Sequence, residues 1–242
     1  MTERTDFLYP FIEPLTGPPT GPPIESRERD ASALLDDLAR SARAKAAASS
    51  HLRETTLDAS GPVLEAAAAA IAERLEVGRR MFFFGNGGSS SDAASLANLF
   101  GRPSIGRPVA ARHLGDDGAV LTALSNDVGF DLVFSRQLIA HAHAGDIAIG
   151  LSTSGNSRNL LMAFATAADR GLVTIGIAGY SGGEMARSGH VQHCLVVDDD
   201  SVHRIQEAQA ALGFELWCRV QARLTAAKPA QKEVGDHGRQ RP

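Results

Sequence analysis

The chain has 242 residues, of which 43% are hydrophobic and 21% are charged, and its formal net charge is −4. This length and composition suffice for one globular domain with a sizeable core, and they exclude a chain that is disordered throughout. The weak negative charge gives no electrostatic reason to expect a nucleic acid partner. Two widely spaced cysteines, no apolar run of about 20 residues and no secretory signal at the start together favour the reducing cytoplasm over a membrane or secreted location.

The first part of the chain, residues 1–28, holds six of the eleven prolines, which excludes a regular helix or a central strand. We predict a Pro-rich N-terminal arm here. Its apolar residues around Phe7–Ile12 leave two interpretations open: the arm docks on the domain or on a neighbouring subunit, or it is a mobile tail. The domain itself, with its N-terminal helices, is expected over residues 29–225, followed by a flexible C-terminal tail over 226–242.

Hydrophobic periodicity predicts the elements in chain order. Helical patterns over Asp30–Leu57 and Pro62–Glu76 predict two packing helices. Short apolar runs bounded by small or acidic residues then predict five strands, at 80–85, 109–115, 146–152, 173–179 and 193–199. Amphipathic stretches between them predict crossover helices at 130–142 and 157–170, and a long last helix is expected at 202–224. This alternation predicts an α/β fold with a doubly wound, five-stranded parallel sheet flanked by helices.

Two loops that follow predicted strands have the composition of anion sites, and ligands of such sheets bind beyond the carboxyl ends of the strands. The first, "GNGGSSSD" (85–92), combines glycines that allow close backbone approach with serines, including Ser89, where a helix begins. Taken alone, it is equally well explained as a tight turn capped by serine. The second, "STSGNS" (152–157), groups four hydroxyls around a glycine. Neither loop has the lysine of a Walker motif, so together they predict a phosphate ester ligand rather than a nucleoside triphosphate machine.

Four motifs carry a resemblance to a known family: "GNGGS", "SNDVGFDLVFSR" (125–136), "STSGNS" and "RIQE" (204–207). Their order and spacing resemble those of SIS (sugar isomerase) domain proteins. More narrowly, they resemble the bacterial phosphoheptose isomerases, which interconvert sedoheptulose 7-phosphate and a manno-heptose 7-phosphate. The resemblance covers roughly residues 30–224. It implies the SIS-type, flavodoxin-like fold and a homotetramer whose active sites lie between subunits.

The resemblance also implies a set of substrate-binding residues drawn from five segments. The Gly turn would contribute Asn86, Gly87 and Gly88, and the sugar hydroxyls would be contacted by Asn126 and Asp127. The phosphate loop would contribute Ser152, Thr153, Ser154 and Ser157. Gln206 would come from the late helix, and Arg102 matches an arginine of the family pocket. Within this set, the serines and Thr153 would hold the phosphate, and Gln206 would face the reactive end of the sugar.

The positions that carry chemistry in the family differ in this chain. Family members have His and Glu four residues apart on the helix after the Gly turn, and Gln and His eight residues apart on the late helix. Zinc-dependent members bind the metal with these four side chains. Here the positions hold Ser95, Leu99, Gln206 and Phe214. Three of the four cannot serve as base, proton shuttle or good zinc ligand, so we expect neither zinc nor another cofactor.

Other side chains could substitute for the missing groups, and Asp127, His203 and Glu207 are the weak candidates. Asp127 is otherwise a capping residue, and His203 an ordinary residue at a helix start. Glu207 points about 100° away from its neighbour around the helix. Asp92 is interpreted as a helix N-terminal charge stabilised by the helix dipole.

Two functional hypotheses follow. The residues favour a non-catalytic SIS module that binds a sugar phosphate and senses it or bridges a protein partner. The alternative is an active sedoheptulose 7-phosphate isomerase, an aldose–ketose isomerase that uses substitute residues. Both hypotheses assume a cytoplasmic homotetramer that binds neither nucleic acid nor membrane.

Overall fold

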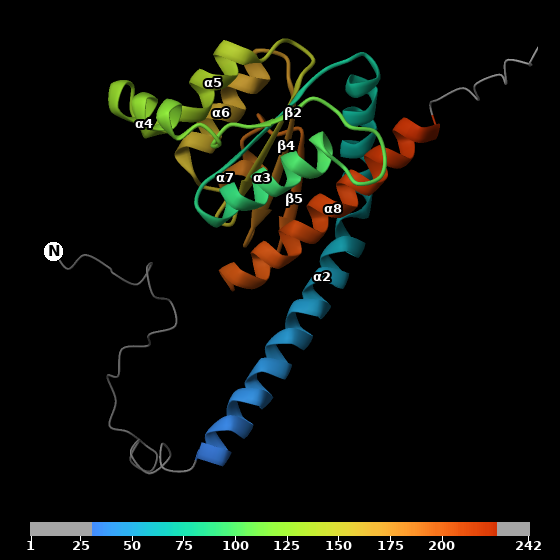
Figure 1. Ribbon diagram of the computed structural model, residues 1–242, viewed down its shortest axis with the longest axis vertical. Coiled ribbons are helices and arrows are strands. Elements are labelled where there is room, and N and C mark those ends of the chain that lie inside the picture. The colour runs from blue at the N-terminus through green and yellow to red at the C-terminus, as the bar shows by residue number, and fades with distance from the viewer. Residues whose placement is uncertain (1–30, 227–242) are drawn as a thin grey trace, which may run out of the picture. The chain divides into compact units, whose positions relative to one another are not determined.

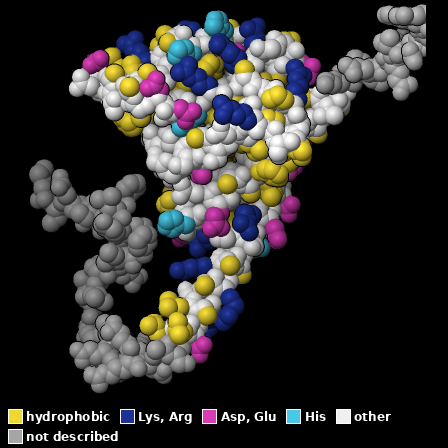
Figure 2. Space-filling view, in the orientation of Figure 1, with side chains coloured by type: hydrophobic (Ala, Val, Ile, Leu, Met, Phe, Trp, Pro, Cys, Tyr) yellow, Lys and Arg dark blue, Asp and Glu magenta, His cyan; other side chains and the backbone are white. Residues whose placement is uncertain are grey.

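The computed structural model describes residues 31–226, so the predicted arm (1–28) and the predicted tail beyond Ala226 lie outside the described residues. The chain divides into two compact units, Met1–Ala48 and Ser49–Pro242. The described part of the first unit is helical and exposes the apolar side chains of Leu34, Leu35 and Leu38 (Figure 2). Within residues 31–226, no helix is long and apolar enough to cross a bilayer.

A single helix, α2 (Ala31–Glu76), replaces the two helices that the sequence predicted. The break was expected before Pro62, but the helix continues through this residue. A proline inside a helix removes one backbone hydrogen bond, and the alanine-rich turns on both sides favour helix strongly. Buried residues such as Leu64, Ile71 and Leu75 then anchor this segment in the core, which helps to offset the cost of the proline.

The second unit is built on a sheet of five parallel strands, as predicted. The strands are β1 (Met81–Gly85), β2 (Ala111–His113), β3 (Ile147–Ser152), β4 (Val173–Gly179) and β5 (His193–Val197). Their order, β2-β1-β3-β4-β5, is the flavodoxin-like order. Strand β2 lies on one side of β1, and β3 lies on the other. The loops after β1 and β3 therefore flank the topological switch point, where ligands of such sheets bind.

Helices cover both faces of the sheet (Figure 1). The core on one face joins α3 (Gly88–Gly101), α8 (Val202–Ala226) and the second half of α2, and the core on the other joins α5 (Val133–His141), α6 (Arg158–Asp169) and α7 (Gly183–Arg187). Side chains of β1 alternate between them, with Phe83 on the first side and Phe84 on the second. The short α7 was not predicted, and α4 (Gly118–Asp127) with the 3-10 helix η1 (Phe130–Leu132) follows β2.

Candidate functional site

Two reciprocal side-chain hydrogen bonds connect the loop after β1 to the start of α6, the helix that follows the loop after β3. Asn86, at the end of β1, and Asn159, in the first turn of α6, donate to each other through Nδ2 and accept through Oδ1, at 2.9 Å in both directions. Asn159 is buried and Asn86 is half-buried. Asn86 therefore fixes the Gly turn against the second loop, a role that the sequence did not reveal because its partner lies 73 residues away.

The Gly turn, Gly85–Gly88, also receives a side chain from α8. A Cβ atom at Gly88 would lie 2.1 Å from Nε2 of Gln206, so only a glycine leaves room for this amide. Gly87 has a φ of 53°, a conformation that glycine adopts without strain. The structure thus brings Gln206 to the turn, and Ser89 lies buried directly behind it.

The second loop, Ser152–Ser157, is called the hydroxyl loop below. Oγ of Ser152 lies 3.4 Å from Oγ of Ser154 and 3.3 Å from Oγ of Ser157. The backbone N–H of Gly155 donates to Ser152 Oγ at 3.1 Å, which holds the loop in a tight turn. Ser157 is the N-cap residue of α6, yet its hydroxyl makes no capping hydrogen bond and stays with the cluster. Thr153 lies beside it, half-buried.

Close backbone packing makes the hydroxyl loop rigid. Gly155 has a φ of 64°, and a Cβ atom there would lie 2.1 Å from the carbonyl oxygen of Gly182, in the loop after β4. The side chain of Asn156 accepts a hydrogen bond from the backbone N–H of Glu184 at 2.8 Å. The three clustered hydroxyls are therefore held on a framework that cannot shift locally without moving the neighbouring loop.

A cavity of about 120 Å³ lies between α3 and α8, two helices that pack against each other (Figure 1). We call it the α3–α8 pocket. Its walls include Asp92, Ser95, Leu96, Leu99, Gln209 and Phe214. Three of the positions that the resemblance connects with metal binding, Ser95, Leu99 and Phe214, thus line one cavity. The Ser95 hydroxyl donates to the carbonyl oxygen of Ser91 at 2.9 Å, and the Phe214 ring lies with its centroid 5.6 Å from that of Trp217.

One polar residue of this pocket, Gln209, was missed in the sequence, and another, Asp92, was misinterpreted. Gln209 is fully buried, and its Nε2 donates to the carbonyl oxygens of Ser152 and Ile177, at 3.3 and 3.2 Å. Its Oε1 has no hydrogen-bond partner among residues 31–226. Asp92 was interpreted as a charge at the helix start, but it lies one turn further along α3 and lines the pocket.

The carboxyl group of Asp92 is in an unusual setting. Its Oδ2 is buried without a hydrogen-bond partner in the described part of the chain. Burial raises the pKa of this carboxyl above its ordinary value. Asp92 precedes Ser95 by three residues and Leu99 by seven, which places all three on one face of α3. That spacing was the signal in the sequence that could have located it.

A second polar cluster lies at the start of α3 on the side of β2. Oγ of Ser90 is 3.1 Å from Nε2 of His113, and Nδ1 of His113 is 2.7 Å from Oδ1 of Asp116. His113 is buried whereas Asp116 is exposed. None of the three lines the α3–α8 pocket, so we interpret the cluster as a tie between α3 and the end of β2.

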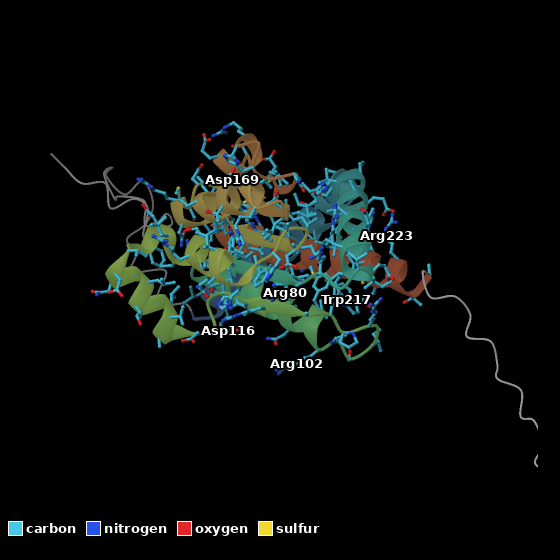
Figure 3. The ribbon with its side chains drawn as sticks, turned by 90° about the horizontal axis from the view of Figure 1, so that it is seen from above. Arg80, Arg102, Asp116, Asp169, Trp217 and Arg223 are labelled. Atoms are coloured by element: carbon cyan, nitrogen blue, oxygen red, sulfur yellow. The ribbon has the colours of Figure 1, made fainter. Side chains whose placement is uncertain are left out.

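Three predicted site residues lie away from the two loops. Arg102 is exposed at the opposite end of α3 from the Gly turn and points outward (Figure 3). Asn126 and Asp127 end α4, are both exposed, and are joined by a 2.9 Å hydrogen bond from Asn126 Nδ2 to Asp127 Oδ1. No hydrogen bond within residues 31–226 links them to either loop.

The remaining candidate bases face solvent. His203 and Glu207 are exposed in the first two turns of α8, and neither lines the α3–α8 pocket. Oε2 of Glu207 lies 3.9 Å from Nη1 of Arg53. Arg204, between them, is paired with Asp199 at 2.9 Å. The carboxylate that does line the pocket is Asp92.

Known proteins share this architecture. The model of the SIS domain family matches residues 46–179. The phosphoheptose isomerase of Sulfurimonas denitrificans is 46% identical over 137 residues, which are 56% of this chain and 69% of that protein. The solved phosphoheptose isomerase of Francisella tularensis has a TM-score of 0.71 at 28% identity, covering 78% of this chain and 98% of that one.

A second solved structure, the phosphoheptose isomerase of Neisseria gonorrhoeae, has a TM-score of 0.69 at 32% identity, covering 76% of this chain and 99% of that one. These similarities confirm the resemblance that the four motifs indicated, and with it the SIS-type fold.

Proposed function

Because the chain belongs to the SIS (sugar isomerase) domain family, and within it resembles the phosphoheptose isomerases, we propose that it binds a phosphorylated sugar at the hydroxyl loop and the Gly turn. One observation carries the proposal: the hydroxyls of Ser154 and Ser157 both lie within 3.4 Å of the Ser152 hydroxyl, just before α6. Phosphate oxygens accept hydrogen bonds on several sides, and hydroxyls and first-turn N–H groups donate them. The hydroxyl loop would therefore hold the phosphate, with Thr153 at its side.

The sugar would extend from the hydroxyl loop along the Gly turn toward α8. Asn86 is fixed against α6 by Asn159, and Gln206 packs on Gly88, so both are positioned before a ligand arrives. Preorganised polar groups of this kind lower the entropic cost of binding. Beyond Gln206, the next cavity is the α3–α8 pocket, which would receive the end of the sugar remote from the phosphate.

We further propose that the protein is a binding or regulatory module rather than an isomerase. Moving a carbonyl between two carbons requires a base for the carbon-bound proton and a group that carries a proton to oxygen. Leu99 and Phe214 offer neither, and the Ser95 hydroxyl is engaged with a backbone carbonyl. The alternative, an active sedoheptulose 7-phosphate isomerase, would need Asp127, His203 or Glu207, and none of these lines the α3–α8 pocket of its own chain.

The residues at the family's zinc positions do not fit a zinc ion. Structural and catalytic zinc sites use thiolate, imidazole and carboxylate ligands. The four positions here offer one hydroxyl, one amide and two hydrocarbon side chains, and the amide of Gln206 is packed against Gly88. Within residues 31–226, no group of three or more His, Cys, Asp or Glu side chains could hold a metal ion. We therefore derive no step through a metal.

The proposed assembly is a cytoplasmic homotetramer with sites between subunits. Arg102, Asn126 and Asp127 are exposed in the single chain. This exposure is expected of residues that complete the site of a neighbouring subunit. A protein partner that reads the bound state would fit a regulatory module. Sedimentation of the full chain tests the first point, since a monomer at micromolar concentration would contradict a site shared between subunits.

Turnover is the decisive test of the function. We expect purified protein to bind sedoheptulose 7-phosphate in calorimetry and to form no aldose from it, with or without added zinc. Robust aldose formation that Asp127→Asn, His203→Gln or Glu207→Gln abolishes would overturn the binding-module proposal in favour of the isomerase. Absence of binding by any sugar phosphate would overturn the proposal as a whole.

A further inference from the structure

Two residues that line the α3–α8 pocket, Asp92 and Gln209, each hold a buried oxygen without a hydrogen-bond partner among residues 31–226. Gln209 is fixed in orientation, because its Nε2 donates to two backbone carbonyl oxygens, of Ser152 and Ile177. Its Oε1 must then be the atom left over, and it is buried and unpartnered among residues 31–226. Oδ2 of Asp92 is in the same condition at the wall of the same cavity. A buried acceptor without a donor is costly, so both residues are held in settings that do not favour folding by themselves.

The pocket also carries an uncompensated negative charge. Asp92 is the only ionisable residue among those that line it. None of the ion pairs within residues 31–226 includes Asp92, whereas Asp199, in the turn before α8, is paired with Arg204. A half-buried carboxylate without a cation is stabilised when a cationic ligand group neutralises it.

Apart from Ser95, the rest of the wall is apolar, and it includes an aromatic ring. Leu96 and Leu99 come from α3, and Phe214 from α8. The face of a phenyl ring attracts an ammonium group through its quadrupole, which a hydroxyl does not exploit. The volume of about 120 Å³ corresponds to about four water molecules, enough for the end of a sugar chain but not for a whole hexose.

These features together favour one kind of ligand group. A hydroxyl brings a single donor and no charge, whereas an ammonium group brings three donors and a positive charge. We propose that the α3–α8 pocket binds the ammonium group of an amino-sugar phosphate, with the Asp92 carboxylate as its counter-charge and Phe214 against it. This inference rests on the proposed function, in which the hydroxyl loop holds the phosphate of the same molecule.

Three probes that differ only at carbon 2 test the inference in calorimetry: glucosamine 6-phosphate, glucose 6-phosphate and N-acetylglucosamine 6-phosphate. We expect the full-length protein to bind the amine about tenfold or more tightly than the alcohol, the gain of a charge-assisted hydrogen bond. The N-acetyl compound has no ammonium group and should show no such gain. Equal affinities for the amine and the alcohol would overturn the inference while leaving phosphate binding intact.

Variants locate the effect. Asp92→Asn keeps the shape of the side chain and removes its charge, so the preference for the amine should fall to about onefold to twofold, with little change for glucose 6-phosphate. Asp169→Asn, which removes an exposed carboxylate at the end of α6, should retain the full preference. An undiminished preference in Asp92→Asn would overturn the assignment of the pocket. If none of the three probes binds the parent protein while sedoheptulose 7-phosphate does, this inference fails and the proposed function stands; if sedoheptulose 7-phosphate does not bind either, both fail.

Discussion

The hydroxyl loop and the α3–α8 pocket, which Gln209 joins by its hydrogen bond to the Ser152 carbonyl, are opposites in hydrogen bonding. In the hydroxyl loop, Ser152, Ser154 and Ser157 all lie within hydrogen-bond distance of one another or of backbone N–H groups. In the pocket, Asp92 and Gln209 each leave a buried oxygen without a partner in residues 31–226. One region is complete and rich in donors, and the other is incomplete and rich in acceptors.

This difference indicates what each region can recognise. A donor-rich loop at a helix start suits an anion, since hydroxyls and N–H groups can all turn toward it. An acceptor-rich pocket suits a donor or a cation. Gln209 connects the two, because it donates to the carbonyl oxygen of Ser152, in the hydroxyl loop, and also lines the pocket. A ligand with a phosphate at one end and a donor group at the other would satisfy both.

The largest expected effect comes from breaking the framework of the hydroxyl loop. In Gly155→Ala, the new Cβ would lie 2.1 Å from the Gly182 carbonyl oxygen at a backbone φ of 64°, so backbone rather than a flexible side chain must move. We expect the free energy of unfolding to fall by about 3 kcal/mol, as for other strained backbone positions, together with loss of sugar-phosphate binding. Urea titration and calorimetry measure the two effects.

Gly118→Ala provides the matched control, since a Cβ at this first residue of α4 would meet nothing within 4 Å. It should leave both stability and binding close to those of the parent chain. A Gly155→Ala protein that unfolds at the parent's urea midpoint would show that the two loops are not packed as described.

Removing the hydroxyls tests the donor-rich half without disturbing its framework. Ser154→Ala with Ser157→Ala deletes two donors while Ser152, which accepts from the Gly155 N–H, stays in place. Hydrogen bonds to charged groups contribute about 1.5–3 kcal/mol each, so sugar-phosphate affinity should fall by at least tenfold, and the circular dichroism melting curve should hardly change. Thr122→Ala, an exposed hydroxyl on α4, serves as control. Unchanged affinity in the double variant would mean that the phosphate binds elsewhere.

The sequence predicted the donor-rich half far better than the acceptor-rich half. All the hydroxyls of the first come from six consecutive residues after one strand, so local pattern alone assembles them. Asn159 and Gln209 act through partners that are 73 and 57 residues away, and which face of α8 reaches the hydroxyl loop is decided by tertiary packing. The side chains that resemblance assigned to the site from α4 and from the end of α3 are exposed in the single chain, and no sequence pattern shows which subunit they serve.

The fold shows a similar division. The strand "VTIGIAG", buried along its whole length, was located to the residue, because both faces of a parallel sheet are covered and the apolar run has clear ends. The predicted break before Pro62 was wrong, because local propensity was read without the core contacts of the turns that follow. The single turn and a half of α7 carried too short a pattern to be recognised.

The smallest effect concerns the stability that Asp92 costs the fold. Because burial raises its pKa in the folded state, the folded protein holds the proton more tightly than the unfolded chain does, and the ionised carboxylate destabilises the fold at neutral pH. Asp92→Asn should therefore raise the free energy of unfolding at pH 7.5, measured by urea titration, by less than about 1 kcal/mol, because solvent screens the exposed part of the group.

The pH dependence of that gain separates charge from packing. The penalty is fully present above the raised folded-state pKa and disappears as pH falls toward the unfolded value of about 3.9, where the carboxyl is protonated in both states. The midpoints of the parent and of Asp92→Asn should thus converge as the urea titrations move from pH 7.5 to the lowest pH at which both remain folded. A gap that stays constant with pH would point to altered packing instead. A variant that is more stable yet has lost its preference for an amine would show that the unpaired oxygen of Asp92 serves ligand binding rather than folding.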